Sequence, residues 1–168
     1  MIRRAIFLDR DGVLNRRAPP GDYVKSPGEF VWLTGAREGV RRLNDEGWLV
    51  LVVTNQRGVA LGLYGAADVE AIHARAQREL REVGAHVDAF YFCPHGEDDG
   101  CVCRKPQPGM ILQAAREWDV DLAVSYLFGD DERDIEAARR AGVRAHLLPS
   151  DGNLSQALAE TLGPPAQR

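Results

Sequence analysis

The chain has 168 residues, of which 45% are hydrophobic and 27% are charged, and its formal net charge is −4 at pH 7. This length suits one domain with a sizeable core, and the composition is that of an ordinary soluble globular protein. The acidic balance disfavours a protein that coats nucleic acid. No stretch is apolar enough to cross a bilayer, and no signal-peptide core is visible, so we expect one cytoplasmic domain over residues 1–168.

Apolar runs alternate with helical patterns along the chain. We predict five strands, at Ala5–Leu8, Trp48–Val53, Ala89–Phe92, Ser125–Phe128 and Arg144–Leu148. Several are continuously hydrophobic, which is typical of strands buried on both faces of a parallel sheet. Helices are predicted at Gly35–Glu46, from Val69 to Val83, from Pro108 to Trp118, at Asp131–Ala141 and, more weakly, at Leu154–Leu162. This order indicates an α/β fold, a Rossmann-like three-layer sandwich with a central parallel sheet.

The first strand ends in the sequence Asp9-Arg10-Asp11-Gly12. Because side chains alternate along an extended chain, Asp9 and Asp11 can face the same pocket. One aspartate can then attack a substrate while the other handles protons, and their oxygens can hold a hard cation such as Mg²⁺. The alternative is a plain acidic turn, because Asp and Gly favour turns on their own.

Polar residues also follow two other predicted strands, and ligands bind beyond the carboxyl ends of such strands. Thr54-Asn55-Gln56 is either a phosphate cradle or a simple turn. Gly129–Asp134 contains four acids, more than a helix cap needs, so we expect a cation site shared with Asp9. Lys105 is either a surface lysine or the point charge that phosphoryl transfer requires.

All three cysteines lie in a short segment, about 93–103, together with a histidine. An odd number of clustered cysteines does not fit a secreted disulfide framework. Cys93, His95, Cys101 and Cys103 instead form a Cys₃His set suited to a tetrahedral, structural Zn²⁺. The alternative is a group of free thiols near a surface histidine.

Taken together, Asp9-Arg10-Asp11-Gly12, Thr54, Lys105 and Gly129-Asp130 with Asp134 resemble the four ordered motifs of the haloacid dehalogenase (HAD) superfamily of phosphatases. The closer resemblance is to the small bacterial branch that contains heptose 1,7-bisphosphate phosphatase and the histidinol-phosphate phosphatase domain. Phe7–Gly12, Val53–Gln56, Cys103–Pro106 and the cysteine cluster resemble that branch. The resemblance implies a phosphatase without a large cap domain, in which loops shape the substrate pocket.

The resemblance also implies roles for individual residues. Asp9 would be the nucleophile and Asp11 the general acid and base. Mg²⁺ would be held by Asp9, Asp130 and the backbone carbonyl of Asp11. The implied substrate-binding set is Thr54, Asn55, Gln56, Arg104 and Lys105, with Asp134 orienting Lys105. Arg104 would grip a second phosphate; its alternative role is a surface charge or salt bridge.

The substrate implied by this resemblance is a small phosphorylated sugar. The Pro106–Met110 and Asp22–Val24 segments favour heptose 1,7-bisphosphate, and histidinol phosphate is the alternative. Leu61 and Asp131 stand where relatives often carry basic residues. Arg57 would replace the basic residue that is missing at position 61. The carboxylate of Asp131 should repel a phosphorylated substrate unless it points away.

A non-enzymatic alternative is a zinc-stabilised phosphosugar-binding module, which would have lost one of the motif residues, and none is lost. We expect a monomer with no nucleic-acid or membrane partner, and a frayed tail from about 163 to 168.

Overall fold

The structure is a computed structural model that describes residues 2–166. Five parallel strands form one sheet in the order β3-β2-β1-β4-β5. The strands are β1 (Ala5–Leu8), β2 (Leu49–Asn55), β3 (Ala89–Cys93), β4 (Tyr126–Gly129) and β5 (Arg144–Leu147). The predicted α/β class and parallel sheet are therefore confirmed.

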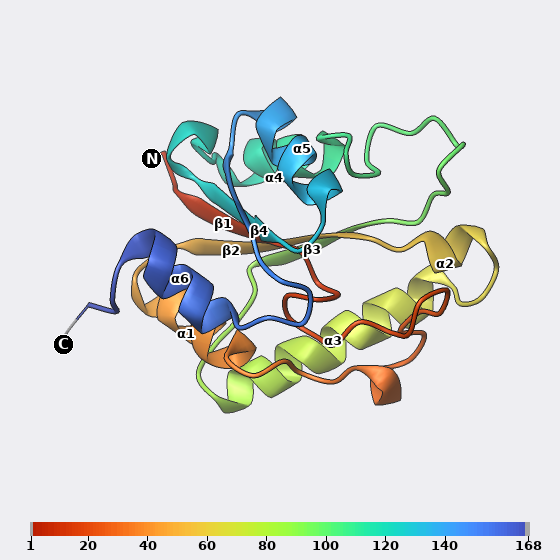
Figure 1. Cartoon of the computed structure of the whole chain (residues 1–168), viewed down its shortest axis with the longest axis horizontal. Coiled ribbons are helices and arrows are strands. Elements are labelled where there is room, and N and C mark those ends of the chain that lie inside the picture. The colour runs from red at the N-terminus through yellow and green to blue at the C-terminus, as the bar shows by residue number, and fades with distance from the viewer. Residues whose placement is uncertain (1, 167–168) are drawn as a thin grey trace.

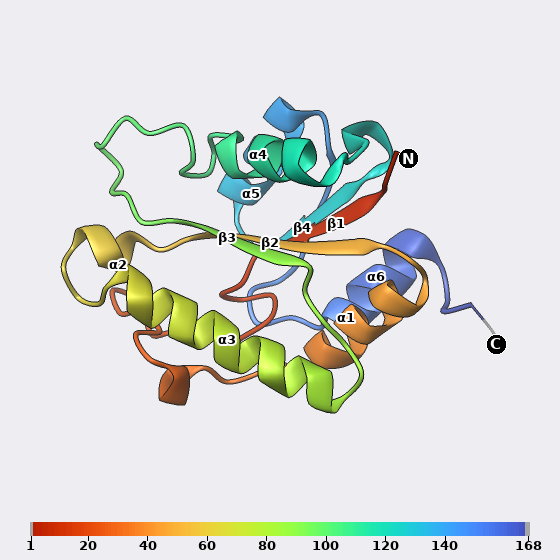
Figure 2. The same cartoon turned by 180° about the vertical axis from the view of Figure 1, so that it is seen from behind.

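Helices cover both faces of this sheet (Figures 1 and 2). They are α1 (Ala36–Asp45), α2 (Arg57–Ala60), α3 (Ala66–Glu82), α4 (Gly109–Trp118), α5 (Glu132–Ala141) and α6 (Leu154–Leu162), with short 3-10 turns at Pro27–Glu29 and Leu122–Val124. Figure 1 shows α4 and α5 on one face and α1, α3 and α6 on the other. This is the three-layer sandwich that the order of elements predicts.

The central strand β1 is buried on both sides, as its continuous hydrophobic run predicts. Ile6 and Leu8 belong to the core between the sheet and the layer that contains α1 and α6. Phe7 points the other way, into the core beneath α4 and α5. All three side chains are fully buried, so β1 is a fixed support for the residues that follow it.

The structure differs from the predicted elements mainly at their ends. Helix α2 was not predicted, because four residues are too few to show a helical period. Pro108 is the N-cap of α4 rather than its first helical residue, and β2 extends through Asn55. Two residues of the predicted frayed tail, 167–168, lie outside the described residues. Within residues 2–166, none of the helices has the length and apolar character that spanning a membrane requires.

Candidate active site

Polar residues from three strand ends share one cavity at the carboxyl edge of the sheet. Asp9 follows β1, Thr54 and Asn55 close β2, and Asp131 is the second residue after β4. The cavity has a volume of about 350 Å³ and is also lined by residues 17–24, the loop after β1. Its size and its position at the strand ends are those of a small-molecule site.

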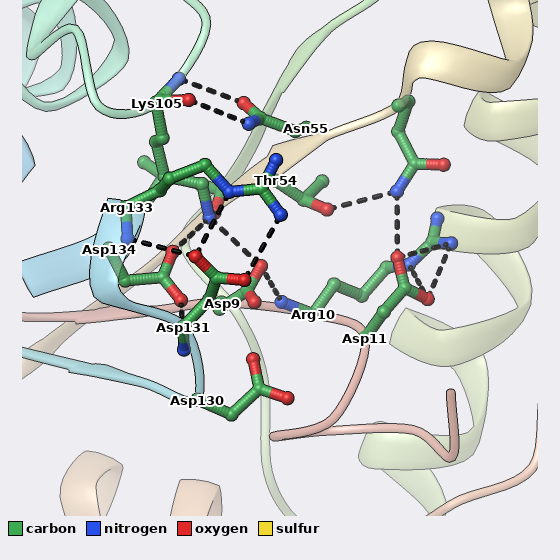
Figure 3. A network of polar contacts seen from close by, with 12 residues as sticks. Asp9, Arg10, Asp11, Thr54, Asn55, Lys105, Asp130, Asp131, Arg133 and Asp134 are labelled. Carbon is green, nitrogen blue, oxygen red and sulfur yellow. Dashed lines mark hydrogen bonds and ion pairs between the residues drawn. The ribbon is translucent and has the colours of Figure 1, made fainter. Parts of the chain in front are cut away.

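Lys105 lies at the buried centre of this site, with only 3% of its surface exposed. Its ammonium group donates hydrogen bonds to Asp9 Oδ1 at 3.0 Å, to Asp134 Oδ1 at 2.5 Å and to the carbonyl of Val53 at 2.9 Å (Figure 3). All three donor positions of the ammonium group are therefore used. The neighbouring carboxylates raise the pKa of Lys105 despite its burial, so it is fully charged at neutral pH.

The carboxylates around Lys105 fit a divalent cation. Oxygens of Asp9, Asp130 and Asp134 lie within 4.8 Å of one another. Hard oxygen donors of this kind suit Mg²⁺. The three carboxylates outnumber their two cationic partners, Lys105 and Arg17, so one negative charge is left unbalanced. Burial, and then the charge of Asp134, raise the pKa of Asp9 well above its usual value, against the opposing effect of Lys105. A bound cation would oppose this rise and keep Asp9 ionised.

Asp9 has one engaged and one available oxygen. The backbone N–H of Arg10 and the Lys105 ammonium group both donate to Oδ1. Among the described residues, none donates a hydrogen bond to Oδ2. A carboxylate held through one oxygen presents the other in a fixed direction, which is the geometry that a nucleophile needs.

Asp11 lines the same cavity, but its carboxylate is turned away from Asp9 (Figure 3). It accepts hydrogen bonds from Arg10 at 2.9 Å, from Asn15 at 2.9 Å and from Gln56 at 3.0 Å. Burial alone would raise its pKa, but the charge of Arg10 and these donors outweigh burial, so its pKa is lowered. Asp9 and Asp11 therefore line the same cavity, as strand alternation predicts, but their carboxylates point in different directions because β1 ends at Leu8.

The residues at the carboxyl end of β2 divide into two hydrogen-bonded groups. Gln56 donates to Thr54 at 2.9 Å and accepts from the hydroxyl of Tyr64 at 2.7 Å. Asn55 uses both ends of its amide on the backbone of Lys105, accepting from its N–H at 3.0 Å and donating to its carbonyl at 3.1 Å. The Asn55 amide thus holds the lysine loop in place, and because Asn55 also lines the cavity, its contact with phosphate stays a prediction.

The carboxylate of Asp130 binds the side chain of Arg17, which sequence reasoning did not identify. Arg17 Nε and Nη2 donate to the two carboxylate oxygens at 2.7 and 2.8 Å. These residues are 113 positions apart, and the loop that carries Arg17 has no periodic pattern, so no local signal could find this contact.

Asp131 was expected to repel phosphate unless it pointed away, and the structure gives a different outcome. It lines the cavity, but Arg133 binds both of its oxygens, at 2.9 and 3.0 Å. The hydrogen bond from Arg133 is the main cause that lowers the pKa of Asp131 to about 2. The sequence analysis did not identify Arg133, although a basic residue in the first turn of α5 opposes the helix dipole and could have indicated a special role.

Arg104 is nine-tenths buried beside the cavity. Its Nη1 is a buried donor without a hydrogen-bond partner. Its Nη2 lies 3.6 Å from Glu97, whose carboxylate also accepts from Arg57 at 3.3 Å. A buried, unsatisfied guanidinium donor costs free energy, so a ligand anion at this place would be strongly bound.

The four predicted zinc ligands converge at the end of β3, which carries Cys93, and in the loop between β3 and α4. The Sγ atoms of Cys93 and Cys103 lie 2.9 Å apart, and His95 Nδ1 lies 3.4 and 3.2 Å from them. Cys101 Sγ is 3.7 Å from Cys93 Sγ. Three sulfur donors and one imidazole gathered this closely fit a tetrahedral Zn²⁺. Cys101 Sγ also accepts the backbone N–H of Arg104 at 3.4 Å, so the cluster is joined to the cavity wall.

Comparisons with known proteins agree with this geometry. A family model described as HAD-hydrolase-like matches residues 102–167. The chain is 45% identical to a D-glycero-beta-D-manno-heptose-1,7-bisphosphate 7-phosphatase of Bordetella bronchiseptica, over 94% of this chain and 86% of the relative. It is 41% identical to a D-glycero-alpha-D-manno-heptose-1,7-bisphosphate 7-phosphatase of Mycobacterium tuberculosis, over 83% of this chain and 74% of the relative.

Solved structures show the same likeness. The crystal structure of D,D-heptose 1,7-bisphosphate phosphatase from B. bronchiseptica, complexed with magnesium and phosphate, matches with a TM-score of 0.83, 45% identity and coverage of 94% of this chain and 86% of that chain. Identity at this level over nearly the whole chain establishes common descent and fold. The chain therefore belongs to the HAD superfamily of hydrolases, in the family of D-glycero-D-manno-heptose-1,7-bisphosphate 7-phosphatases.

Proposed function

We propose that this chain is a magnesium-dependent phosphatase that converts D-glycero-D-manno-heptose 1,7-bisphosphate into the heptose 1-phosphate and inorganic phosphate. The observation that carries the proposal is the buried Asp9–Lys105–Asp134 group beside a cavity at the carboxyl edge of the sheet. The family names support the substrate, and their α and β forms make both anomers candidates.

Asp9 is the proposed nucleophile. Its Oδ2 attacks the phosphorus of the 7-phosphate, the bond to the sugar oxygen breaks, and an aspartyl-phosphate forms. Water then attacks this phosphorus and restores the carboxylate. Lys105 holds Oδ1 and places a positive charge where the transferred group gathers negative charge.

Asp11 is the proposed acid and base. It gives a proton to the departing sugar oxygen and later takes one from the attacking water. Its contacts with Arg10, Asn15 and Gln56 favour the ionised form. To hold a proton at neutral pH, the carboxyl group must therefore leave these partners and turn toward Asp9 when substrate is bound.

The magnesium ion would be held by Asp9, Asp130 and the backbone carbonyl of Asp11. When bound, it neutralises charge on the phosphoryl group and on Asp9. Asp134 has a different task, because its two oxygens accept from Lys105 and from the backbone N–H of Asp131. It orients the lysine and closes the start of α5.

Arg104 is the proposed ligand of the phosphate that is not cleaved. Its unpartnered Nη1 is a ready donor, and a guanidinium group binds phosphate through paired charge-assisted hydrogen bonds. We propose that zinc at Cys93, His95, Cys101 and Cys103 fixes the loop that carries Arg104 and Lys105. Since four protein ligands leave no open position, this zinc is structural.

The alternatives from the sequence receive less support. The relatives compared above are heptose bisphosphate phosphatases, so histidinol phosphate is not favoured. A silent binding module would not need a nucleophile with an available oxygen. The cytoplasmic location and the monomeric state stay predictions.

A phosphate-release screen tests the proposed function. Purified protein with Mg²⁺ is given both anomers of the heptose bisphosphate, histidinol phosphate and simple sugar monophosphates, and NMR identifies the phosphate that is lost. We expect the highest kcat/KM for one heptose anomer, with loss at carbon 7. Asp9→Asn keeps the shape of the side chain and should abolish turnover. Near-normal turnover by Asp9→Asn, or a preference for histidinol phosphate, would contradict the proposal.

A further inference from the structure

The contact between Arg17 and Asp130 pairs an accessible cation with an enclosed carboxylate. The Asp130 side chain has no exposed surface, whereas 40% of the Arg17 side chain is exposed. The guanidinium group uses two nitrogens on the two oxygens, at 2.7 and 2.8 Å. This bidentate arrangement is the strongest form of a side-chain ion pair.

The chain around this pair is built to bring the two groups together. Gly12 has a φ of +90°, and a Cβ at this position would lie 2.0 Å from Asp130 Oδ2 and 3.0 Å from Arg17 Nε. Only glycine therefore leaves room for the pair. On the other side, the backbone N–H of Arg17 donates to Asp151 Oδ1 at 2.9 Å, which fixes the start of the arginine side chain.

Charge balance explains why Asp130 needs this partner. The Lys105 ammonium group donates hydrogen bonds to Asp9, Asp134 and the carbonyl of Val53, so none of its three protons is used on Asp130. Arg17 supplies the positive charge for this third carboxylate, and its pKa is raised by the contact. Asp130 is also a ligand of the proposed magnesium site. A guanidinium group and a divalent cation repel each other, so each weakens the binding of the other to the same carboxylate.

We propose that Arg17 and the metal ion exchange places on Asp130. In the metal-free protein, Arg17 is the counter-ion of Asp130. When the cation binds, Arg17 leaves, and its guanidinium group turns into the cavity that it already lines, where it binds the substrate's phosphate. The inference rests on the proposed function, because it takes Asp130 as a metal ligand. It makes Arg17 a substrate-binding residue that becomes available only after the metal is in place.

Metal binding without substrate tests the first step. Zinc-replete protein is dialysed to remove exchangeable cations, and Mn²⁺ is titrated while free Mn²⁺ is followed by electron paramagnetic resonance. Arg17→Gln removes the competing charge, so it should bind Mn²⁺ about tenfold more tightly than the original protein. Arg16→Gln is the matched control, because it removes the same charge from the neighbouring exposed residue, whose side chain is not bound to Asp130. It should change the affinity much less.

Phosphate binding tests the second step. With Mg²⁺ at saturation, inorganic phosphate is titrated by calorimetry, and Arg17→Gln should bind it roughly five- to tenfold more weakly. Arg17→Lys keeps the positive charge but loses the bidentate guanidinium geometry, so its Mn²⁺ and phosphate affinities should lie between those of the original protein and Arg17→Gln.

Equal or weaker Mn²⁺ binding by Arg17→Gln would overturn the proposal, since Arg17 would then support Asp130 in the metal-bound state. Tighter Mn²⁺ binding with unchanged phosphate binding would overturn its second step. Failure of the original protein to bind Mn²⁺ at all, with no difference from Asp130→Asn, would instead contradict the proposed magnesium site.

Discussion

At the scale of single residues, Arg133 neutralises the charge that Asp131 presents to the cavity. An isolated carboxylate in this cavity would repel a phosphorylated substrate, but Arg133 binds both of its oxygens. Asp131 also caps α5 by accepting the backbone N–H of Arg133 at 2.9 Å. Asp131 stands where relatives often carry a basic residue, and Arg133, two residues later, supplies the positive charge that compensates for it.

This pairing predicts the effect of Arg133→Gln. The change leaves Asp131 unpaired, so KM for the phosphorylated substrate should rise by about fivefold, equivalent to ~1 kcal/mol of repulsion. Steady-state kinetics check this, with Arg139→Gln as a control on the exposed side of the same helix. The double change Asp131→Asn with Arg133→Gln should restore most of the loss. A double variant as poor as the single one would show that Arg133 itself contacts the substrate.

Arg104 provides a second test at the scale of one residue. If it binds the phosphate that is not cleaved, Arg104→Ala should lower kcat/KM for the bisphosphate by roughly 10- to 100-fold, or about 1.5–3 kcal/mol. A monophosphate cleaved at the same position lacks the distal group and should lose far less. Arg139→Ala is a matched control, because Arg139 also pairs with a glutamate, Glu136, but is 71% exposed and does not line the cavity. Equal losses for both substrates would return Arg104 to a role in the loop or at the reacting group.

At the scale of elements, the loop between β3 and α4 joins the thiol cluster to the catalytic lysine. Cys103 and Lys105 are two residues apart, and Asn55 holds the lysine backbone from β2. The loop has little apolar core of its own, so a metal is the simplest source of its rigidity.

The loop predicts one bound zinc per chain, measured by elemental analysis of gently purified protein. Removing it with a strong chelator should lower the melting temperature by roughly 4–8 °C, as expected for a loss of ~2 kcal/mol in a domain of this size. Activity should fall with it and should not return when Mg²⁺ alone is restored. Cys101→Ser should behave like the chelated protein, whereas Val102→Ser, at an exposed position of the same loop, should keep its zinc. Unchanged stability without zinc would contradict a structural metal.

Sequence patterns predicted the regular elements better than the contacts between them. The bounds of β1 and α6 agree with the prediction because a hydrophobic run and an apolar period extend over each element. The Arg17–Asp130 contact joins a loop to a distant strand end, and no local pattern encodes it. The direction of Asp11 was also out of reach, because alternation holds only while the strand continues.

At the scale of the whole molecule, the site lies at the point in the sheet where the order of strand addition reverses. β1 is central, and the chain adds β2 and β3 on one side and β4 and β5 on the other. The β2 side contributes Thr54 and Asn55, and the β4 side contributes the carboxylates that follow Gly129. Because Asp9 stands between the two halves, its chemistry depends on the packing of the entire sheet rather than on one motif.

The buried Arg10–His73 contact ties this packing to pH. Arg10 is fully buried after β1, and its Nη1 lies 3.3 Å from His73 Nε2 on α3. The His73 ring stacks on Phe90 of β3, with ring centres 4.4 Å apart. Burial, reinforced by the charge of Arg10, lowers the pKa of His73 from 6.5 to about 3. Protonation of this ring therefore opposes folding, and the neutral ring receives a hydrogen bond from Arg10.

The sign of the resulting pH dependence follows from where the proton binds. Above about pH 6.5, His73 is neutral in the folded and unfolded states, and its contribution to stability is fully present. As the pH falls from 6.5 toward 3, only the unfolded state takes up the proton, so the free energy of unfolding decreases. Between about pH 7.5 and pH 5 the free energy of unfolding should therefore fall by about 2 kcal/mol, because pH 5 lies about 1.5 units below the ordinary histidine pKa of 6.5 and each unit contributes about 1.4 kcal/mol.

Urea unfolding of the original protein and of His73→Gln at both pH values checks this, because the glutamine side chain can accept a hydrogen bond from Arg10 but does not titrate. The original protein should lose about 2 kcal/mol more than the variant, and the shared acid sensitivity of the thiol cluster cancels in that difference. Equal losses in the two proteins would mean that His73 accepts a proton inside the folded molecule.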